Sequence, residues 1–158
     1  MKEVWIRNRQ RRHPVDVQEL HRLTQFLLES LLTLEHFQLG IHFVGPRAMA
    51  GVNQRYLTHQ GPTDVITFNH AGPDQPLYGE LFICPEVAAG QALEFHTSRA
   101  DELVRYVVHG VLHLQGYDDA TPVERRRMKR LENRLFQTLR RRFPLSESGG
   151  RPRVSRKR

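Results

Sequence analysis

The chain has only one cysteine, Cys84, in 158 residues, so no disulfide can form within it. Long apolar runs are also missing: stretches such as 26–28 and 81–84 are far shorter than the roughly 20 residues that a membrane-spanning helix needs. The first residues lack the basic and then apolar pattern of a secretory signal. These absences exclude a disulfide scaffold and a membrane protein, and they predict a cytoplasmic protein without membrane partners.

Positive charge is concentrated at one end of the chain. Residues 1–119 hold 10 Lys and Arg against 14 Asp and Glu, a net charge of −4, whereas residues 120–158 hold 14 against 3, a net charge of +11. Together they give the +7 of the whole chain. Such a basic segment favours binding of an acidic polymer such as nucleic acid, because binding releases counterions. The solvated face of a helix followed by a solubilising tail would give the same composition.

The pattern of apolar residues predicts strands early in the chain and helices late. Alternating or β-branched segments predict strands at 4–8, 41–44, 63–68 and 77–84. Apolar spacings of three and four predict helices at 17–32, 46–56, 85–95, 98–114 and 122–143. Turn residues at 71–76 predict a hairpin. The order of these elements predicts one α+β domain over 1–145, followed by a flexible basic tail over 146–158.

Two histidines, His109 and His113, stand four residues apart in the predicted helix 98–114, which places both imidazoles on one side of it. This spacing suits a tetrahedral site for a divalent metal ion. Gly116 can reverse the chain after the helix, and of the two acids that follow, Asp118 and Asp119, we take Asp119 as the third ligand. Two hydrogen-bonded core histidines would show the same spacing.

Gly110 follows the first histidine directly. Metalloproteases with the H-E-x-x-H signature carry their general-base glutamate at that position, so peptide hydrolysis by that route is disfavoured. A glycine there lets a large substrate backbone approach closely, and tight helix–helix packing would require one equally.

The stretch 109–118, HGVLHLQGYD, resembles the HGxLHLxGYD signature of the YbeY endoribonuclease family. Upstream residues resemble other motifs of that family in the same order: Asn53, Tyr56, 62–65 and Phe68 its N-x-x-Y…PTDVLSF block, Gly79 and Glu80 its Gly-Asp strand, and Gln91, Ala92 and His96 its next helix. The likeness extends over 49–119.

This resemblance implies an α+β fold with a mixed sheet of about four strands, about five helices and a metal site on a helix after the sheet. It implies one Zn²⁺ or another divalent ion per chain, held here by His109, His113 and Asp119. It also implies single-strand-specific cleavage in maturation of the 3′ end of the small-subunit ribosomal RNA and in ribosome quality control. Ribosomal RNA and the small ribosomal subunit are the implied partners.

Further residues are expected to take part in catalysis or in RNA binding. The candidates for catalysis are Glu80 and Asp118. Glu80 could be a general base or support a metal ligand, and simple exposure on the surface would fit its position equally. The candidates for binding RNA phosphates are Arg55, Arg125, Arg126 and Arg130.

Two positions depart from the family pattern. Asp119 stands where the family has its third metal histidine, and a carboxylate adds negative charge that makes a bound ion less electrophilic. Leu57 stands where the family has an arginine implicated in RNA handling, although Arg55 and His59 are close by. Two alternatives therefore stay open: an RNA-binding ribosome-assembly factor with weakened or lost catalysis, and a metal hydrolase with a non-RNA substrate.

Overall fold

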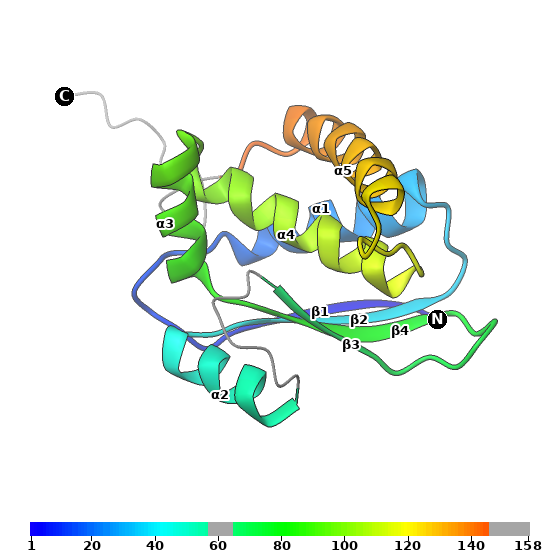
Figure 1. Ribbon diagram of the computed structural model, residues 1–158, viewed down its shortest axis with the longest axis horizontal. Helices are drawn as coiled ribbons and strands as arrows, with labels where there is room; N and C mark the ends of the chain where they lie inside the picture. Colours follow the sequence, from blue (N-terminus) through cyan, green and yellow to red (C-terminus); the bar gives the residue numbers. More distant parts are fainter. Residues whose placement is uncertain (57–64, 146–158) are drawn as a thin grey trace.

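A computed structural model describes residues 1–56 and 65–145 of the chain, with only the backbone of Arg55 and Tyr56 (Figure 1). Leu57, His59, the start of the strand predicted at 63–68 and the tail predicted at 146–158 lie outside the described residues. The elements are β1 (Lys2–Asn8), α1 (Val17–Phe26), the π-helical turn η1 (Leu27–Leu31), β2 (Phe37–Phe43), α2 (Pro46–Tyr56), β3 (Val65–Asn69), β4 (Leu77–Ile83), α3 (Pro85–Phe95), α4 (Arg99–Leu114) and α5 (Pro122–Arg142).

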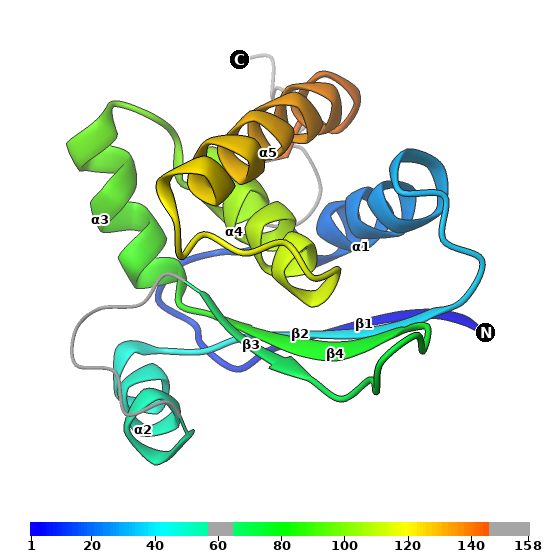
Figure 2. The same ribbon diagram turned by 45° about the vertical axis from the view of Figure 1, so that its right-hand side comes forward.

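The four strands form one mixed sheet in the order β1-β2-β4-β3. β1 and β4 both pair with β2 in parallel, whereas β3 and β4 pair in antiparallel, which confirms the predicted hairpin. Helices α1, α4 and α5 lie over one face of the sheet and α2 lies over the other (Figures 1 and 2). The expected α+β class with a mixed sheet is confirmed. No helix among the described residues is long and apolar enough to cross a membrane.

Strand alternation divides the buried side chains between two cores. The larger core lies between the sheet and α1, α4 and α5, and it includes Leu39, Leu81 and Leu112. The smaller one lies on the opposite face, where Met49 of α2 packs with Val44, Ile66 and Cys84. Cys84 is fully buried at the end of β4 and has a packing role.

Helix α4 lies very close to the sheet, because glycine stands at its contact with β4. A Cβ atom on Gly110 would lie 2.7 Å from Leu81 Cδ2, and one on Gly79 would lie 2.9 Å from Leu114 Cδ2. Both distances are shorter than any carbon–carbon contact in a packed interior. Gly110 therefore serves close packing, but against the sheet and not against another helix as expected.

Two elements differ from their predicted form. β2 begins at Phe37, four residues before the predicted strand, because Gly40 pairs between Trp5 of β1 and Glu80 of β4 at the centre of the sheet. Tertiary pairing overrides the weak strand preference of glycine there. The helix predicted over 17–32 ends as the π-helical turn η1 instead of a regular α-helix. Over only five residues an α-helix and a π-helix have the same apolar spacing, so the sequence pattern does not distinguish them.

Candidate metal centre

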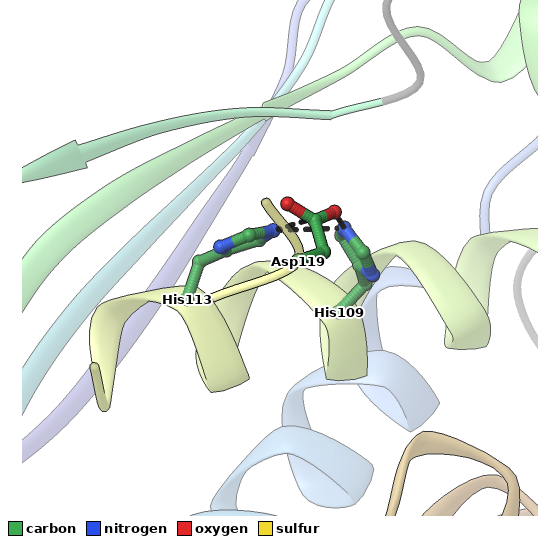
Figure 3. Close-up of side chains that lie close together, drawn as sticks. All are labelled: His109, His113 and Asp119. Atoms are coloured by element: carbon green, nitrogen blue, oxygen red, sulfur yellow. Dashed lines mark hydrogen bonds and ion pairs between the residues drawn. The ribbon is translucent and has the colours of Figure 1, made fainter. Parts of the chain in front are cut away.

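Helix α4 and the loop after it bring three potential metal ligands together (Figure 3). His113 Nε2 lies 3.0 Å from His109 Nε2. Asp119 Oδ2 lies 3.9 Å from the first imidazole, at His109 Nε2, and 3.7 Å from the second, at His113 Nε2. The structure thus places the three residues as the histidine spacing predicted.

The separations fit the donor geometry of a zinc-type ion. Ligand atoms about 2.0–2.1 Å from a tetrahedral ion are about 3.3 Å from one another. The three observed distances of 3.0, 3.7 and 3.9 Å lie within about 0.6 Å of that value, so small rotations of the side chains would bring the three atoms to it. Two imidazole nitrogens and a carboxylate oxygen are also an established ligand set for zinc, and three protein ligands leave one coordination position for water or substrate.

The end of α4 explains why the aspartate reaches the histidines. Gly116 has a φ of +98°, its N–H donates to His113 O and the Tyr117 N–H donates to Leu112 O. These two bonds form a Schellman motif, which reverses the chain at a left-handed glycine. The predicted helix stop is confirmed, and it returns residue 119 towards the preceding turns of α4.

Two further contacts hold the loop that carries Asp119. The exposed Asp118 accepts a hydrogen bond of 2.7 Å from the Asp119 N–H through Oδ1. Arg125 Nη1 donates to Asp119 O at 3.2 Å, and Thr121 caps α5 by accepting from the Glu124 N–H. The start of α5, with Thr121 as its N-cap, therefore fixes the loop.

A fourth residue, Glu132 of α5, supports the first histidine and was missed in the sequence. Its Oε1 accepts a 2.8 Å hydrogen bond from His109 Nδ1, and the residue is only 5% exposed. Because a carboxylate only accepts, the imidazole proton sits on Nδ1 and the Nε2 lone pair points to the cluster. Glu132 stands four residues after Met128 and three before Leu135, so a carboxylate in the apolar stripe of α5 was the available signal.

The electrostatics of Glu132 favour its charged form. Burial by itself raises the pKa of this carboxyl, but the hydrogen bond from His109 and the ammonium of Lys129 outweigh burial and lower it below 4.5. Lys129 Nζ and Arg105 Nη1 lie 3.3 and 3.5 Å from Glu132 Oε2. The buried carboxylate is thus ionised and paired on both oxygens.

A cavity of about 860 Å³ opens beside the cluster, between α3, α4, α5 and the start of β3. It is lined by His109 and Asp119 and by four cationic side chains, which are Arg105, Arg125, Arg126 and Lys129. The structure therefore brings two of the predicted RNA-binding residues to the site. Arg130 is exposed on α5 and does not line the cavity, and the side chain of Arg55 lies outside the described residues.

Glu80 lies on the other face of the sheet from the metal cluster. Its β4 neighbour Leu81 contacts α4, so strand alternation directs Glu80 away from that helix. There it accepts 2.8 Å hydrogen bonds from His42 Nε2 and His70 Nε2. Burial raises the pKa of Glu80, but these hydrogen bonds and the charges of the two imidazoles lower it below 4.5 overall.

The sequence was compared with protein families and with known proteins. The model of the family described as Endoribonuclease YbeY matches residues 5–140. A protein named Endoribonuclease YbeY from Thermobifida fusca (strain YX) is 36% identical over 137 residues, which cover 81% of this chain and 88% of that protein. One of the same name from Salinispora tropica is 37% identical over 140 residues, covering 80% of this chain and 89% of that one.

The fold has a solved counterpart as well. The solution structure of TM1509 from Thermotoga maritima is similar to this one with a TM-score of 0.66 and 25% sequence identity. The likeness covers 89% of this chain and 91% of the other. The arrangement of sheet and helices described above is therefore shared over nearly the whole length of both proteins.

Proposed function

This chain belongs to the Endoribonuclease YbeY family, and from that premise we propose that it hydrolyses phosphodiester bonds in single-stranded RNA with the help of one divalent metal ion. The observation that carries this proposal is the convergence of His109, His113 and Asp119 beside a cation-lined cavity, to whose wall His109 and Asp119 contribute. Cationic side chains neutralise the phosphates of an RNA strand, and the three ligands place an ion beside them.

A zinc-type ion held there would supply Lewis acidity for attack on phosphorus by water or by a 2′-hydroxyl. Glu132 keeps the imidazole of His109 in the tautomer and orientation that ligation requires. Arg125 and Arg126 would bind the phosphates on either side of the reacting one. Of the two candidates for proton transfer, Asp118 adjoins the ligand Asp119 on the same loop, whereas Glu80 faces away from the cavity.

The proposal extends to the substrate that the family resemblance implies. The RNA would be ribosomal, with cleavage near the 3′ end of the small-subunit RNA during maturation and quality control, and the small ribosomal subunit would be the partner in the cytoplasm. The +11 charge of residues 120–158 supports binding to so large an acidic assembly.

Metal content and RNA cleavage, measured together, test the proposal. Protein purified without added metal should carry about one zinc-type ion per chain and cleave a single-stranded oligonucleotide but not a duplex. His113→Ala should lose the ion and the cleavage. The matched control His36→Ala changes an exposed histidine just before β2 that is not one of the three potential ligands, and it should keep both. Equal cleavage by the wild type and His113→Ala would refute metal-dependent catalysis at this site.

The carboxylate ligand favours a second candidate, an RNA-binding assembly factor with weak catalysis. Asp119 is the most exposed of the three ligands, with 45% of its side chain accessible, and it carries negative charge. Imidazole in its place leaves the ion more electrophilic, so Asp119→His should raise the cleavage rate severalfold if the carboxylate limits catalysis. RNA binding by the wild type without measurable cleavage, together with cleavage by Asp119→His, would establish this second function.

A further inference from the structure

We propose that the cavity beside the metal cluster is a subsite for one nucleotide of a single-stranded RNA, with its base stacked on Phe95 and its phosphate held by α5. The proposal rests on the proposed function and specifies how the candidate site would bind its RNA substrate. It concerns Phe95, which is not among the individual residues by which the chain resembles its family.

Phe95 is placed for this role by the end of α3. It is the last residue of that helix, it is 58% exposed, and its side chain lines the cavity. His96 follows with a φ of 57° and turns the chain towards α4, where Thr97 Oγ1 donates to Glu102 Oε2 at 2.8 Å. A large aromatic ring held at the wall of a cavity and left in solvent is a natural platform for a base.

The opposite wall of the cavity is cationic. Figure 2 shows α3 and α5 on two sides of α4, and α5 contributes Arg125, Arg126 and Lys129 to the lining. The carboxylates of Glu102 and Glu132 also line the cavity, but each residue is only 5% exposed and already accepts hydrogen bonds. Lys129 is paired with Glu132, so the accessible charge that α5 adds to this lining comes from the exposed Arg125 and Arg126, whereas the aromatic ring of Phe95 belongs to α3.

This division of the walls matches the chemistry of a nucleotide. A base presents a flat apolar face, and a phosphate presents negative charge at the other end of the same unit. Proteins that bind single strands combine stacking platforms with cationic grooves, and stacking tolerates any base. At about 860 Å³ the cavity lies within the range of sites that enclose small ligands, which gives room for a nucleotide next to His109.

Affinity for RNA with and without bases tests the subsite. The probe is a fluorescent single-stranded oligoribonucleotide, compared with one of equal length that carries abasic sites, and anisotropy is read in a metal chelator so that no cleavage occurs. Phe95→Ala should weaken binding of the ordinary strand by about 5- to 100-fold and change binding of the abasic strand little. Phe95→Trp should retain the wild-type affinity.

Two variants serve as references in the same assay. Leu93→Ala removes a side chain that is 81% exposed on the same helix and does not line the cavity, so it should bind both strands as the wild type does. Arg126→Ala should weaken both strands alike and lower the slope of log affinity against log salt by about 0.7, the share of one phosphate contact.

The outcomes separate the subsite from the function on which it rests. Equal affinity of the wild type and Phe95→Ala for the ordinary strand would overturn the subsite, even if the protein cleaves RNA. An equal loss on the abasic strand would overturn base stacking as well, because the ring would then act on the backbone or on the fold. If binding depends on Phe95 while cleavage is absent with metal restored, the subsite stands and the nuclease proposal fails.

Discussion

At the scale of single residues, the candidate metal centre is supported by a side chain that is not one of its three potential ligands. Glu132 accepts the Nδ1 proton of His109 from a position that is almost fully buried, and it is paired with Lys129 and Arg105. Residues that orient a metal-binding histidine in this way raise its basicity and hold its ring in place. The strength of the site is thus set partly by α5, which supplies none of the three ligands.

This role predicts how changes at Glu132 affect metal affinity. Glu132→Ala should raise the dissociation constant for Zn²⁺ by about 10- to 100-fold, whereas Glu132→Gln, whose amide oxygen still accepts the Nδ1 proton, should lose much less. Competition with a chromophoric chelator measures both constants. Glu94→Ala, at an exposed carboxylate of α3, is the control. Unchanged affinity in Glu132→Ala would show that the hydrogen bond does not support ligation.

Glu80 gives a second prediction at this scale, on stability and pH. Its folded pKa is below 4.5, so the carboxylate stabilises the fold above that pH, and the contribution disappears as the pH falls through the folded pKa. Glu80→Gln should therefore lower the free energy of unfolding by about 1 kcal/mol at pH 6 and by less at pH 3. Urea unfolding of both proteins at the two pH values measures this. An equal difference at both would contradict the assignment.

At the scale of elements, the contact between α4 and β4 sets where the histidines lie. Gly110 sits between His109 and His113 in sequence and faces Leu81 and Val65 of the sheet. Because Leu81 is fully buried, it has no free space into which to move. The glycine therefore permits the close approach of helix and sheet, which sets where α4 holds the two imidazoles, and His109 lines the cavity.

Alanine at two helical glycines tests this packing. Gly110→Ala should destabilise the fold by about 1–3 kcal/mol, because its Cβ would overlap Leu81. Gly90→Ala in α3 meets nothing within 4 Å and should stabilise it by about 0.5–1 kcal/mol through helix propensity. Thermal or urea unfolding compares the two with the wild type. Similar shifts of the same sign in both would show that propensity alone acts at residue 110.

At the scale of the whole molecule, charge is distributed unevenly. Residues 1–119, which include the sheet and the metal ligands, are net acidic, whereas α5 and the residues after it carry the basic excess. The cavity lies where the two meet, since three of its four cations, Arg125, Arg126 and Lys129, belong to α5, whereas His109 belongs to α4. An acidic polymer would therefore be attracted along α5 towards the cluster.

Removal of residues 149–158 tests how much of the attraction for an acidic polymer comes from residues after α5. The segment holds five Lys and Arg, and the slope of log affinity against log salt should fall by about 0.7 for each RNA phosphate that these side chains neutralise. Binding to single-stranded RNA should weaken at low salt and approach wild-type affinity at high salt. If the truncated protein shows the same slope as the full chain, the segment binds no phosphates.

The sequence by itself determined the features that depend on neighbouring residues. Apolar spacing gave the helices, the four-residue interval put His109 and His113 on one side of α4, and Gly116 ended that helix where a left-handed residue was needed. These features follow from local geometry, since helix period and turn conformation are fixed within a few residues.

Contacts between residues far apart in the chain follow from tertiary packing alone. It placed Glu132 against a histidine 23 residues away, turned Glu80 to the opposite face, and formed the cavity between Phe95 and the arginines of α5. A one-residue difference decides which face of a strand a side chain occupies, and the packing of one helix on another decides which side chains meet. The strand face and the helix contacts both depend on how the whole chain buries its two cores. No short stretch of sequence encodes either of them.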